Sequence, residues 1–425
     1  MRKRSWSAAI AALALVVAAC GGDDDDDGGG AAEGTDQAPA TTTADTGAAT
    51  TAASEDGTET TAAEPGGAAP TTAASGEATE CETVDDVSLQ LQWFIQAQFA
   101  GYLAAIDQGY YDKYCLNVEI LEGGVDIVPQ QVLADGQADF AIAWVPKALQ
   151  TREQGADITN IAQIFQRSGT LQVSFKDDNI IDPADFAGKN IGNWGFGNEY
   201  EIFAALNQAG LDPAADVNLV QQQFDMLGLL SGDIDAAEAM TYNEYAQVLE
   251  AENPETGELY QPDDLNVVSY EDVGVGMLQD AIWADAARLD SDEAYRDASV
   301  RFLAASIEGW IYCRDNPESC RDIVVAAGSQ LGDSHQLWQM NEINKLIWPS
   351  RDGIGTLDPS AWQRTVQLAQ NTPNLEGATV LTAAPTDGAF RNELITEAQS
   401  LVGENQDIAG MEFAPTDVTL EPGGS

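Results

Sequence analysis

Four short segments of the sequence combine an aromatic side chain with polar neighbours, and none of them contains Lys or Arg. They are residues 93–102, 144–146, 193–200 and 240–245. Aromatic faces attract flat rings through dispersion and quadrupole contacts, and adjacent amides or carboxylates can hydrogen-bond the rim of such a ring. The candidate ligand-binding residues are Trp93, Gln96, Gln98, Phe99, Tyr102, Trp144, Trp194, Asn198, Glu199, Tyr242, Asn243 and Glu244.

The chemistry of these segments predicts an aromatic or heteroaromatic ligand that is uncharged or carries N–H donors. Nitrate, sulfonate or phosphate ligands need cations or dense N–H donors, which the segments lack. Gly195 and Gly197 precede an expected helix, but Glu199 and Glu201 in its first turn argue against a phosphate site. A packing role stays open, because aromatic residues at strand ends often join lobes and Asn or Glu often cap helices.

The four segments lie at or just after the ends of expected strands in an alternating strand and helix pattern. This alternation predicts an α/β fold with mostly parallel sheets, in which ligands bind outside the carboxyl ends of strands. We expect strands at residues 89–94, 117–121, 140–144, 190–194, 217–220, 236–240, 266–270 and 277–284, and helices at 100–108, 129–134, 198–209, 226–230, 242–250, 291–313, 323–327, 334–347 and 358–370.

The pattern restarts after a polar stretch at residues 178–188, which predicts two similar lobes. Strands 266–270 and 277–284 are expected to return to the first lobe. Crossovers near 172–177 and 273–282 would form a hinge, with the four segments lining the cleft. The expected boundaries are 81–175 plus 275–425 for lobe 1 and 176–274 for lobe 2.

The first twenty residues have the pattern of an export signal. Arg2, Lys3 and Arg4 precede an apolar run at residues 8–19 that is too short to span a bilayer. The run ends at Cys20 in a sequence that resembles the lipobox of bacterial lipoproteins, which implies lipidation of Cys20. The alternative is an ordinary secretory signal with an incidental cysteine.

Residues 21–80 are rich in Ala, Thr, Gly and acidic residues and contain no aromatic residue. Such a composition buries too little surface to offset the entropy of ordering, so we expect a disordered tether. No later stretch approaches twenty apolar residues, so we expect the lipid to be the only membrane attachment.

The four cysteines that remain after Cys20 predict two disulfides in an oxidising compartment. Three pairings are possible. Cys313 and Cys320 flank a turn-rich hexapeptide and are expected to close a short loop, which would leave Cys81 to pair with Cys115. A zinc site is the alternative, but the chain has one histidine and no C-x-x-C pair.

The formal net charge is -52, from 70 acidic and 18 basic residues. A charge of this sign excludes binding to a nucleic-acid backbone and favours a soluble monomer. No nucleophile–base pair, cofactor fingerprint or metal cluster is visible in the sequence, so neither a cofactor nor a metal is expected.

Several segments together resemble the periplasmic solute-binding proteins related to thiamine pyrimidine synthase. They are residues 93–105, 109–111, 123–124, 135–140, 188–192 and 240–245. The resemblance covers roughly residues 87–350. It implies a two-lobed periplasmic-binding-protein fold of type II. It also implies a receptor that passes a thiamine pyrimidine precursor, or a riboflavin-like compound, to the permease and ATPase of an ABC importer.

Two other functions remain as alternatives to a receptor on the extracytoplasmic face of the cell membrane. The synthase itself consumes an active-site histidine and carries a cysteine-rich motif, whereas this chain has only His335 and no cysteine cluster. Phe99 also stands where a histidine is common in the family. An enzyme is therefore not expected. A tethered surface sensor or adhesin would suit the long tether equally well.

Overall fold

The computed structural model describes residues 81–423. The predicted export signal, the lipidation site Cys20 and the tether at residues 21–80 lie outside the described residues. Within residues 81–423, no helix is both long and apolar enough to cross a membrane.

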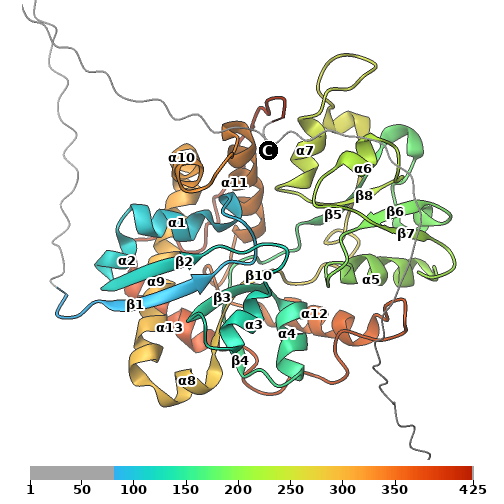
Figure 1. The fold of residues 1–425 in the computed structure, drawn as a ribbon. Helices are drawn as coiled ribbons and strands as arrows, with labels where there is room; N and C mark the ends of the chain where they lie inside the picture. The colour runs from blue at the N-terminus through green and yellow to red at the C-terminus, as the bar shows by residue number, and fades with distance from the viewer. Residues whose placement is uncertain (1–80, 424–425) are drawn as a thin grey trace, which may run out of the picture. The chain divides into compact units, whose positions relative to one another are not determined.

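The first lobe is built on a five-stranded mixed sheet in the order β2-β1-β3-β10-β4 (Figure 1). β1 pairs in parallel with β2 and β3, whereas β10 runs antiparallel to β3 and β4. The strands are β1 (Asp85–Gln90), β2 (Leu116–Leu121), β3 (Phe140–Trp144), β4 (Ile158–Gln163) and β10 (Asp280–Asp285).

Both faces of this sheet are covered by helices because its central strands are apolar on both sides. In β3, Phe140 and Ile142 face one core and Ala141 and Ala143 face the other, as the two-residue period of a strand requires. The first core packs α1 (Ala100–Asp107), α2 (Tyr110–Lys113), α8 (Ala286–Ser291), α9 (Glu293–Asp315), α10 (Pro317–Ala327) and α13 (Asn392–Val402); the second packs α3 (Pro129–Ala134), α4 (Val145–Glu153) and α12 (Pro359–Asn371).

The second lobe contains an antiparallel sheet in the order β8-β5-β9 and a parallel pair of strands, β6 and β7. Helix α11 (Asp333–Ile347) contacts both lobes through side chains described below. The remaining elements are β5 (Thr170–Phe175), β6 (Asn190–Asn193), β7 (Asn218–Gln221), β8 (Ala237–Met240), β9 (Leu265–Ser269), α5 (Tyr200–Ala209), α6 (Leu227–Leu230), α7 (Glu244–Leu249) and the short 3-10 helices Ala97–Phe99, Lys176–Asp178, Pro183–Phe186 and Pro262–Asp264.

The predicted two-lobed α/β fold is confirmed, but three details of the prediction are wrong. The sheets are mixed rather than mostly parallel. β9 pairs with β5 in the second lobe and does not return to the first. β5 itself belongs to the second lobe, so the chain crosses between lobes at residues 164–169 and not after residue 175.

The sequence pattern missed β4 and β5 because their buried side chains include several polar ones. In β5, the Gln172 amide donates to the Gly192 carbonyl at 3.0 Å and accepts from the Tyr270 hydroxyl at 2.9 Å. In β4, the Asn160 amide donates to Gln163 at 2.9 Å. Hydrogen bonds of this kind allow polar residues in a core, so an apolar alternation does not reveal the strand.

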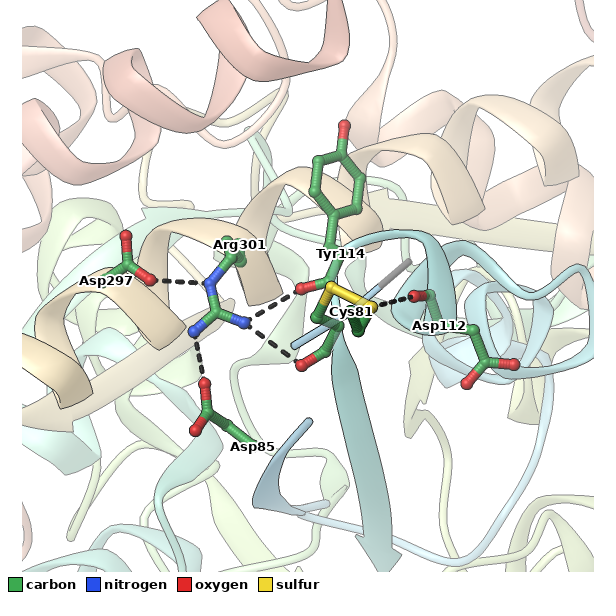
Figure 2. Close-up of a disulfide and its surroundings, with 7 residues drawn as sticks. Cys81, Asp85, Asp112, Tyr114, Asp297 and Arg301 are labelled. Carbon is green, nitrogen blue, oxygen red and sulfur yellow. Dashed lines mark hydrogen bonds and ion pairs between the residues drawn. A yellow bond between two sulfur atoms is a disulfide. The ribbon is translucent and has the colours of Figure 1, made fainter. Parts of the chain in front are cut away.

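Both predicted disulfides are confirmed. Cys313 pairs with Cys320 and Cys81 pairs with Cys115. Figure 2 shows Arg301 of α9 beside the disulfide between Cys81 and Cys115. The Arg301 guanidinium donates to the Tyr114 carbonyl at 2.9 Å and forms ion pairs with Asp85 and Asp297. The start of the described chain is therefore fixed to the first lobe both covalently and by an ion-pair cluster.

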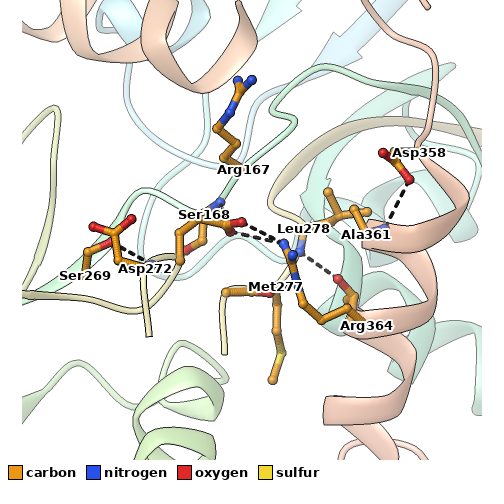
Figure 3. Close-up of polar contacts among 12 residues, drawn as sticks. Arg167, Ser168, Ser269, Asp272, Met277, Leu278, Asp358, Ala361 and Arg364 are labelled. Atoms are coloured by element: carbon orange, nitrogen blue, oxygen red, sulfur yellow. Dashed lines mark hydrogen bonds and ion pairs between the residues drawn. The ribbon is translucent and has the colours of Figure 1, made fainter. Parts of the chain in front are cut away.

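The two crossovers, residues 164–169 and 270–279, are joined to each other and to α12. Figure 3 shows Arg364 of α12 reaching them; it donates to the Gly276 carbonyl at 3.0 Å and pairs with Glu271. Glu271 in turn accepts from the Ser168 N–H at 3.1 Å. These contacts link both crossovers to the first lobe.

Glu201 of α5 provides a second link at the crossovers. Its carboxylate accepts from the Met277 N–H at 2.5 Å and from the Ser168 hydroxyl at 3.0 Å. Burial raises the pKa of Glu201 from 4.5 to about 7, although these hydrogen bonds oppose the shift. The folded protein therefore holds a proton on Glu201 at pH values where the unfolded chain releases it.

Glu201→Gln tests this consequence. A raised folded-state pKa contributes stability that is complete below about pH 4.5 and is lost as the pH rises through about 7. The free energy of unfolding of the unsubstituted protein should therefore fall more steeply over that interval than that of Glu201→Gln, as measured by urea unfolding at a series of pH values. Glu404→Gln, at an exposed position, is the control; equal slopes for all three proteins would contradict the assignment.

Candidate ligand-binding site

A cavity of about 320 Å³ is lined by residues of both lobes. Its walls follow the carboxyl ends of β1, β2 and β3 in the first lobe and of β6, β7 and β8 in the second, as expected for an α/β fold. The lining residues are Gln92, Trp93, Gln96, Gln98, Gly124, Val125, Ile127, Val128, Pro129, Gln130, Trp144, Lys147, Trp194, Phe196, Asn198, Phe224, Met240, Tyr242, Asn243 and Glu244.

The structure brings nine of the twelve predicted site residues together in this cavity: Trp93, Gln96, Gln98, Trp144, Trp194, Asn198, Tyr242, Asn243 and Glu244. Contact of these residues with a ligand stays a prediction. Phe99, Tyr102 and Glu199 lie outside the cavity walls.

The three exceptions have structural roles. Phe99 is completely buried, and Tyr102 packs edge-on against Trp310 with ring centroids 5.6 Å apart. Both side chains belong to the first core of the first lobe. Glu199 precedes α5 and accepts from the Gly197 N–H at 2.9 Å, so it supports the turn before the helix.

Aromatic side chains meet across the cavity. Trp93 of the first lobe lies 4.8 Å from Phe224 of the second, measured between ring centroids. Phe224 stacks on Trp194 at 5.9 Å with an interplanar angle of 19°. The two lobes are therefore already in contact at this wall, and a flat ligand entering the cavity would meet aromatic faces from both.

Asp280, at the start of β10, organises the wall formed by the first lobe. Its carboxylate accepts from Gln92 at 2.6 Å, from Gln98 at 2.9 Å and from the Trp144 indole N–H at 2.9 Å. Burial raises the pKa of Asp280 to about 7, and the three hydrogen bonds oppose that shift. One buried carboxyl group thus sets the orientation of three residues that line the cavity.

A series of amides continues from this wall to the second lobe. The Gln96 amide donates to Gln98 at 2.8 Å and accepts from Gln339 of α11 at 3.1 Å. Gln339 also donates to the Asn243 side-chain oxygen at 2.9 Å. Buried amides that bond to one another have fixed orientations, so this network presets the polar face of the cavity.

His335, the histidine of this chain, also belongs to the network. Its ring lies 3.0 Å from the Glu250 carboxylate and 2.9 Å from the Asn243 side-chain oxygen. It is buried and does not line the cavity. Among the described residues, no group of three or more His, Cys, Asp or Glu side chains is arranged to hold a metal ion.

Glu244 lines the cavity, but both of its carboxylate oxygens have protein donors. They accept from the Met240 N–H at 3.0 Å and from the Asn243 amide at 2.9 Å. Burial raises the pKa of Glu244. The expected acceptor for a ligand N–H is therefore already engaged in fixing the turn between β8 and α7.

The sequence-based expectation of a cavity without positive charge is wrong. Lys147 lies one residue beyond the segment 144–146 and lines the cavity from the first turn of α4. Its ammonium donates to the Asn198 side-chain oxygen of the second lobe at 2.7 Å and lies 5.0 Å from the Trp144 ring centroid. Burial lowers the pKa of Lys147 to about 8, against the effect of Glu199, Glu238 and Asp280.

Other lining residues that the sequence analysis missed lie near the same strand ends. Phe196 is 72% exposed, between Gly195 and Gly197, and all three residues have positive φ values. Residues 124–130 follow β2 and Phe224 follows β7. The rule that ligands bind at the carboxyl ends of strands predicts the residues after β2 and Phe224 after β7 as well.

Two lobes around a cavity at their strand ends define the periplasmic-binding-protein fold, and solved structures agree. The aliphatic sulphonate binding protein SsuA of Escherichia coli matches with a TM-score of 0.53 and 16% identity, over 80% of this chain and 95% of that one. A sulfonate-binding SsuA from Methylobacillus flagellatus matches with a TM-score of 0.56 and 14% identity, over 80% and 100%. Within this fold, the chain belongs to the NMT1/THI5 like family, which it matches over residues 96–320.

Three curated relatives have similar sequences. A Haemophilus influenzae protein named for thiamine biosynthesis is 26% identical over 44% of this chain, which spans only 60% of that relative's length. The formylaminopyrimidine-binding protein of Halalkalibacterium halodurans is 24% identical over 58% of this chain and 72% of its own. The riboflavin-binding protein RibY of Chloroflexus aurantiacus is 26% identical over 74% and 87%.

Substitution of Asp280 tests its role as organiser of the cavity. Asp280→Ala leaves three donors without an acceptor and is expected to lower the free energy of unfolding by about 2 kcal/mol. Asp280→Asn keeps one acceptor oxygen and should cost less. Urea unfolding of both variants measures the difference, and an Ala variant as stable as the Asn variant would show that the three donors find other partners.

Proposed function

We propose that this protein is the solute-binding component of an ABC importer, anchored through Cys20 on the extracytoplasmic face of the cell membrane. Its ligand would be a small planar heteroaromatic compound, either a pyrimidine precursor of thiamine or a riboflavin-like compound. The observation that carries the proposal is the cavity between the lobes, whose opposite walls are aromatic and whose polar face is a preset network of amides.

The size and lining of the cavity suit such a ligand. A volume of about 320 Å³ lies at the lower end of the usual range for small-molecule sites, roughly 300 to 1,000 Å³. A ring bound against the wall formed by Trp93 of one lobe and by Phe224 and Trp194 of the other would contact both lobes at once. Ligand contacts shared by two lobes favour the closed arrangement, and the two crossovers provide a hinge.

The names of the relatives point in the same direction. One is a formylaminopyrimidine-binding protein and another a riboflavin-binding protein, and both ligand classes are flat heteroaromatic rings. A receptor of this kind delivers its ligand unchanged to a permease, whose ATPase supplies the energy. We propose those two proteins as partners, with the receptor acting as a monomer and attached to the membrane only by its lipid.

A thermal-shift panel tests the ligand class. A ligand present at one hundred times its dissociation constant should stabilise the folded protein by about 2.7 kcal/mol. We expect a rise in Tm with hydroxymethyl-aminopyrimidine, thiamine or riboflavin and no rise with nitrate, sulfate or taurine. A response to taurine alone would contradict the proposal.

Trp93→Ala tests the aromatic wall. Trp93 is only partly buried, so its loss should leave the fold intact while removing one face of the ring site. We expect affinity for the ligand found in the panel to fall about tenfold, by titration calorimetry. Trp362→Ala is the matched control, since Trp362 is also partly buried and packs on Phe390, away from the cavity. Equal losses in the two variants would argue against a direct contact.

A further inference from the structure

The charged groups at the cavity differ in how far the protein satisfies them. Asp280 accepts from three side chains, and both oxygens of Glu244 accept from protein N–H groups. Lys147 is different. Its ammonium has three N–H donors, and Asn198 is the single hydrogen-bond acceptor that residues 81–423 offer it. No carboxylate in that range lies within 4 Å of it to form an ion pair.

The position of Lys147 is unfavourable for a residue with a purely structural role. The side chain is largely removed from solvent, which penalises its charge and lowers its pKa to about 8. It also lies in the first turn of α4, where the helix dipole disfavours a cation. Glu199, Glu238 and Asp280 offset this penalty only in part, since the pKa stays lowered, and none of them forms an ion pair with the ammonium. Departures from local preference of this kind concentrate at functional sites.

We propose that Lys147 selects the ligand by donating a hydrogen bond to a carbonyl oxygen on the rim of its ring system. The cavity would then prefer a heteroaromatic compound with a pyrimidinedione edge, as in flavins, over a ring of the same shape without carbonyl groups. This inference rests on the proposed function, because it names the ligand chemistry of the same cavity. It also reverses the expectation that ligand N–H groups meet the carboxylates.

The contact between Lys147 and Asn198 would couple ligand selection to closure of the two lobes. Lys147 belongs to the first lobe and Asn198 to the second, and the Asn198 amide is itself held by donation to the Gly195 carbonyl at 2.9 Å. A ligand carbonyl at Lys147 would therefore bind to the cation that already joins the lobes. The apolar residues Val125, Val128 and Met240 also line the cavity and leave room for a hydrocarbon portion of the ligand.

The experiment compares two three-ring probes that differ in the carbonyl-bearing ring. Lumichrome carries a pyrimidinedione, and 2,3-dimethylphenazine has a similar outline without carbonyl groups. Their dissociation constants are measured by quenching of tryptophan fluorescence in the unsubstituted protein and in Lys147→Met, with Lys176→Met, at an exposed position, as the control.

The unsubstituted protein and the control should bind lumichrome about tenfold more tightly than dimethylphenazine. Lys147→Met should lose about tenfold in affinity for lumichrome and less than about threefold for dimethylphenazine. Lys147→Gln keeps an N–H donor and should retain part of the preference, which provides a second variant if Lys147→Met does not fold. Retention of the full preference in a folded Lys147→Met would overturn the inference.

Asn198→Ala separates ligand contact from lobe contact. If Lys147 only joined the lobes, Lys147→Met and Asn198→Ala would weaken both probes equally, and the inference would be wrong while the proposed function stood. Tight binding of ethanesulfonate that disappears in Lys147→Met would identify an anion site and overturn the inference as well. Failure of the folded, unsubstituted protein to bind any of the heteroaromatic compounds would instead reject the proposed function.

Discussion

The arrangement of the cavity depends on one buried carboxyl group. Asp280 begins the strand that brings the chain back into the first lobe, and it accepts three hydrogen bonds from residues far away in sequence. Its desolvation is unfavourable, as its raised pKa indicates. These hydrogen bonds orient Trp144, Gln98 and Gln92. Burying Asp280 therefore costs stability, but it fixes the shape of the cavity wall in advance, and preorganisation of this kind favours binding.

Much of the fold could be predicted from the sequence because its apolar residues follow regular periods. The helix Pro129–Ala134 and the strand Phe140–Trp144 have the predicted bounds, and both disulfides have the expected partners. Where the core is polar, as in β4 and β5, the period is lost. The placement of the first crossover was wrong for that reason, since a strand stabilised by side-chain hydrogen bonds resembles a loop in sequence.

For the cavity too, the sequence predicts features that depend on neighbouring residues and misses those that depend on contacts between distant residues. Segments at strand ends identified nine residues that line it, because the end of a strand is a local feature. The partners of a polar group are not local. Nothing near Glu244 or Lys147 in sequence indicates that the carboxylate is satisfied by its own turn while the cation has a single acceptor. These contacts are the reason why we propose a ligand that accepts a hydrogen bond from Lys147, where the sequence favoured one that donates to carboxylates.

The bridge between Cys81 and Cys115 has a mechanical consequence. It fastens the entry of the described chain to the edge of the sheet in the first lobe, beside the cluster around Arg301 and on an element that does not line the cavity. A pull on the chain before Cys81 is therefore borne by that lobe alone. In the proposed receptor, attachment at a surface would therefore load the first lobe and not the two crossovers that lead to the second.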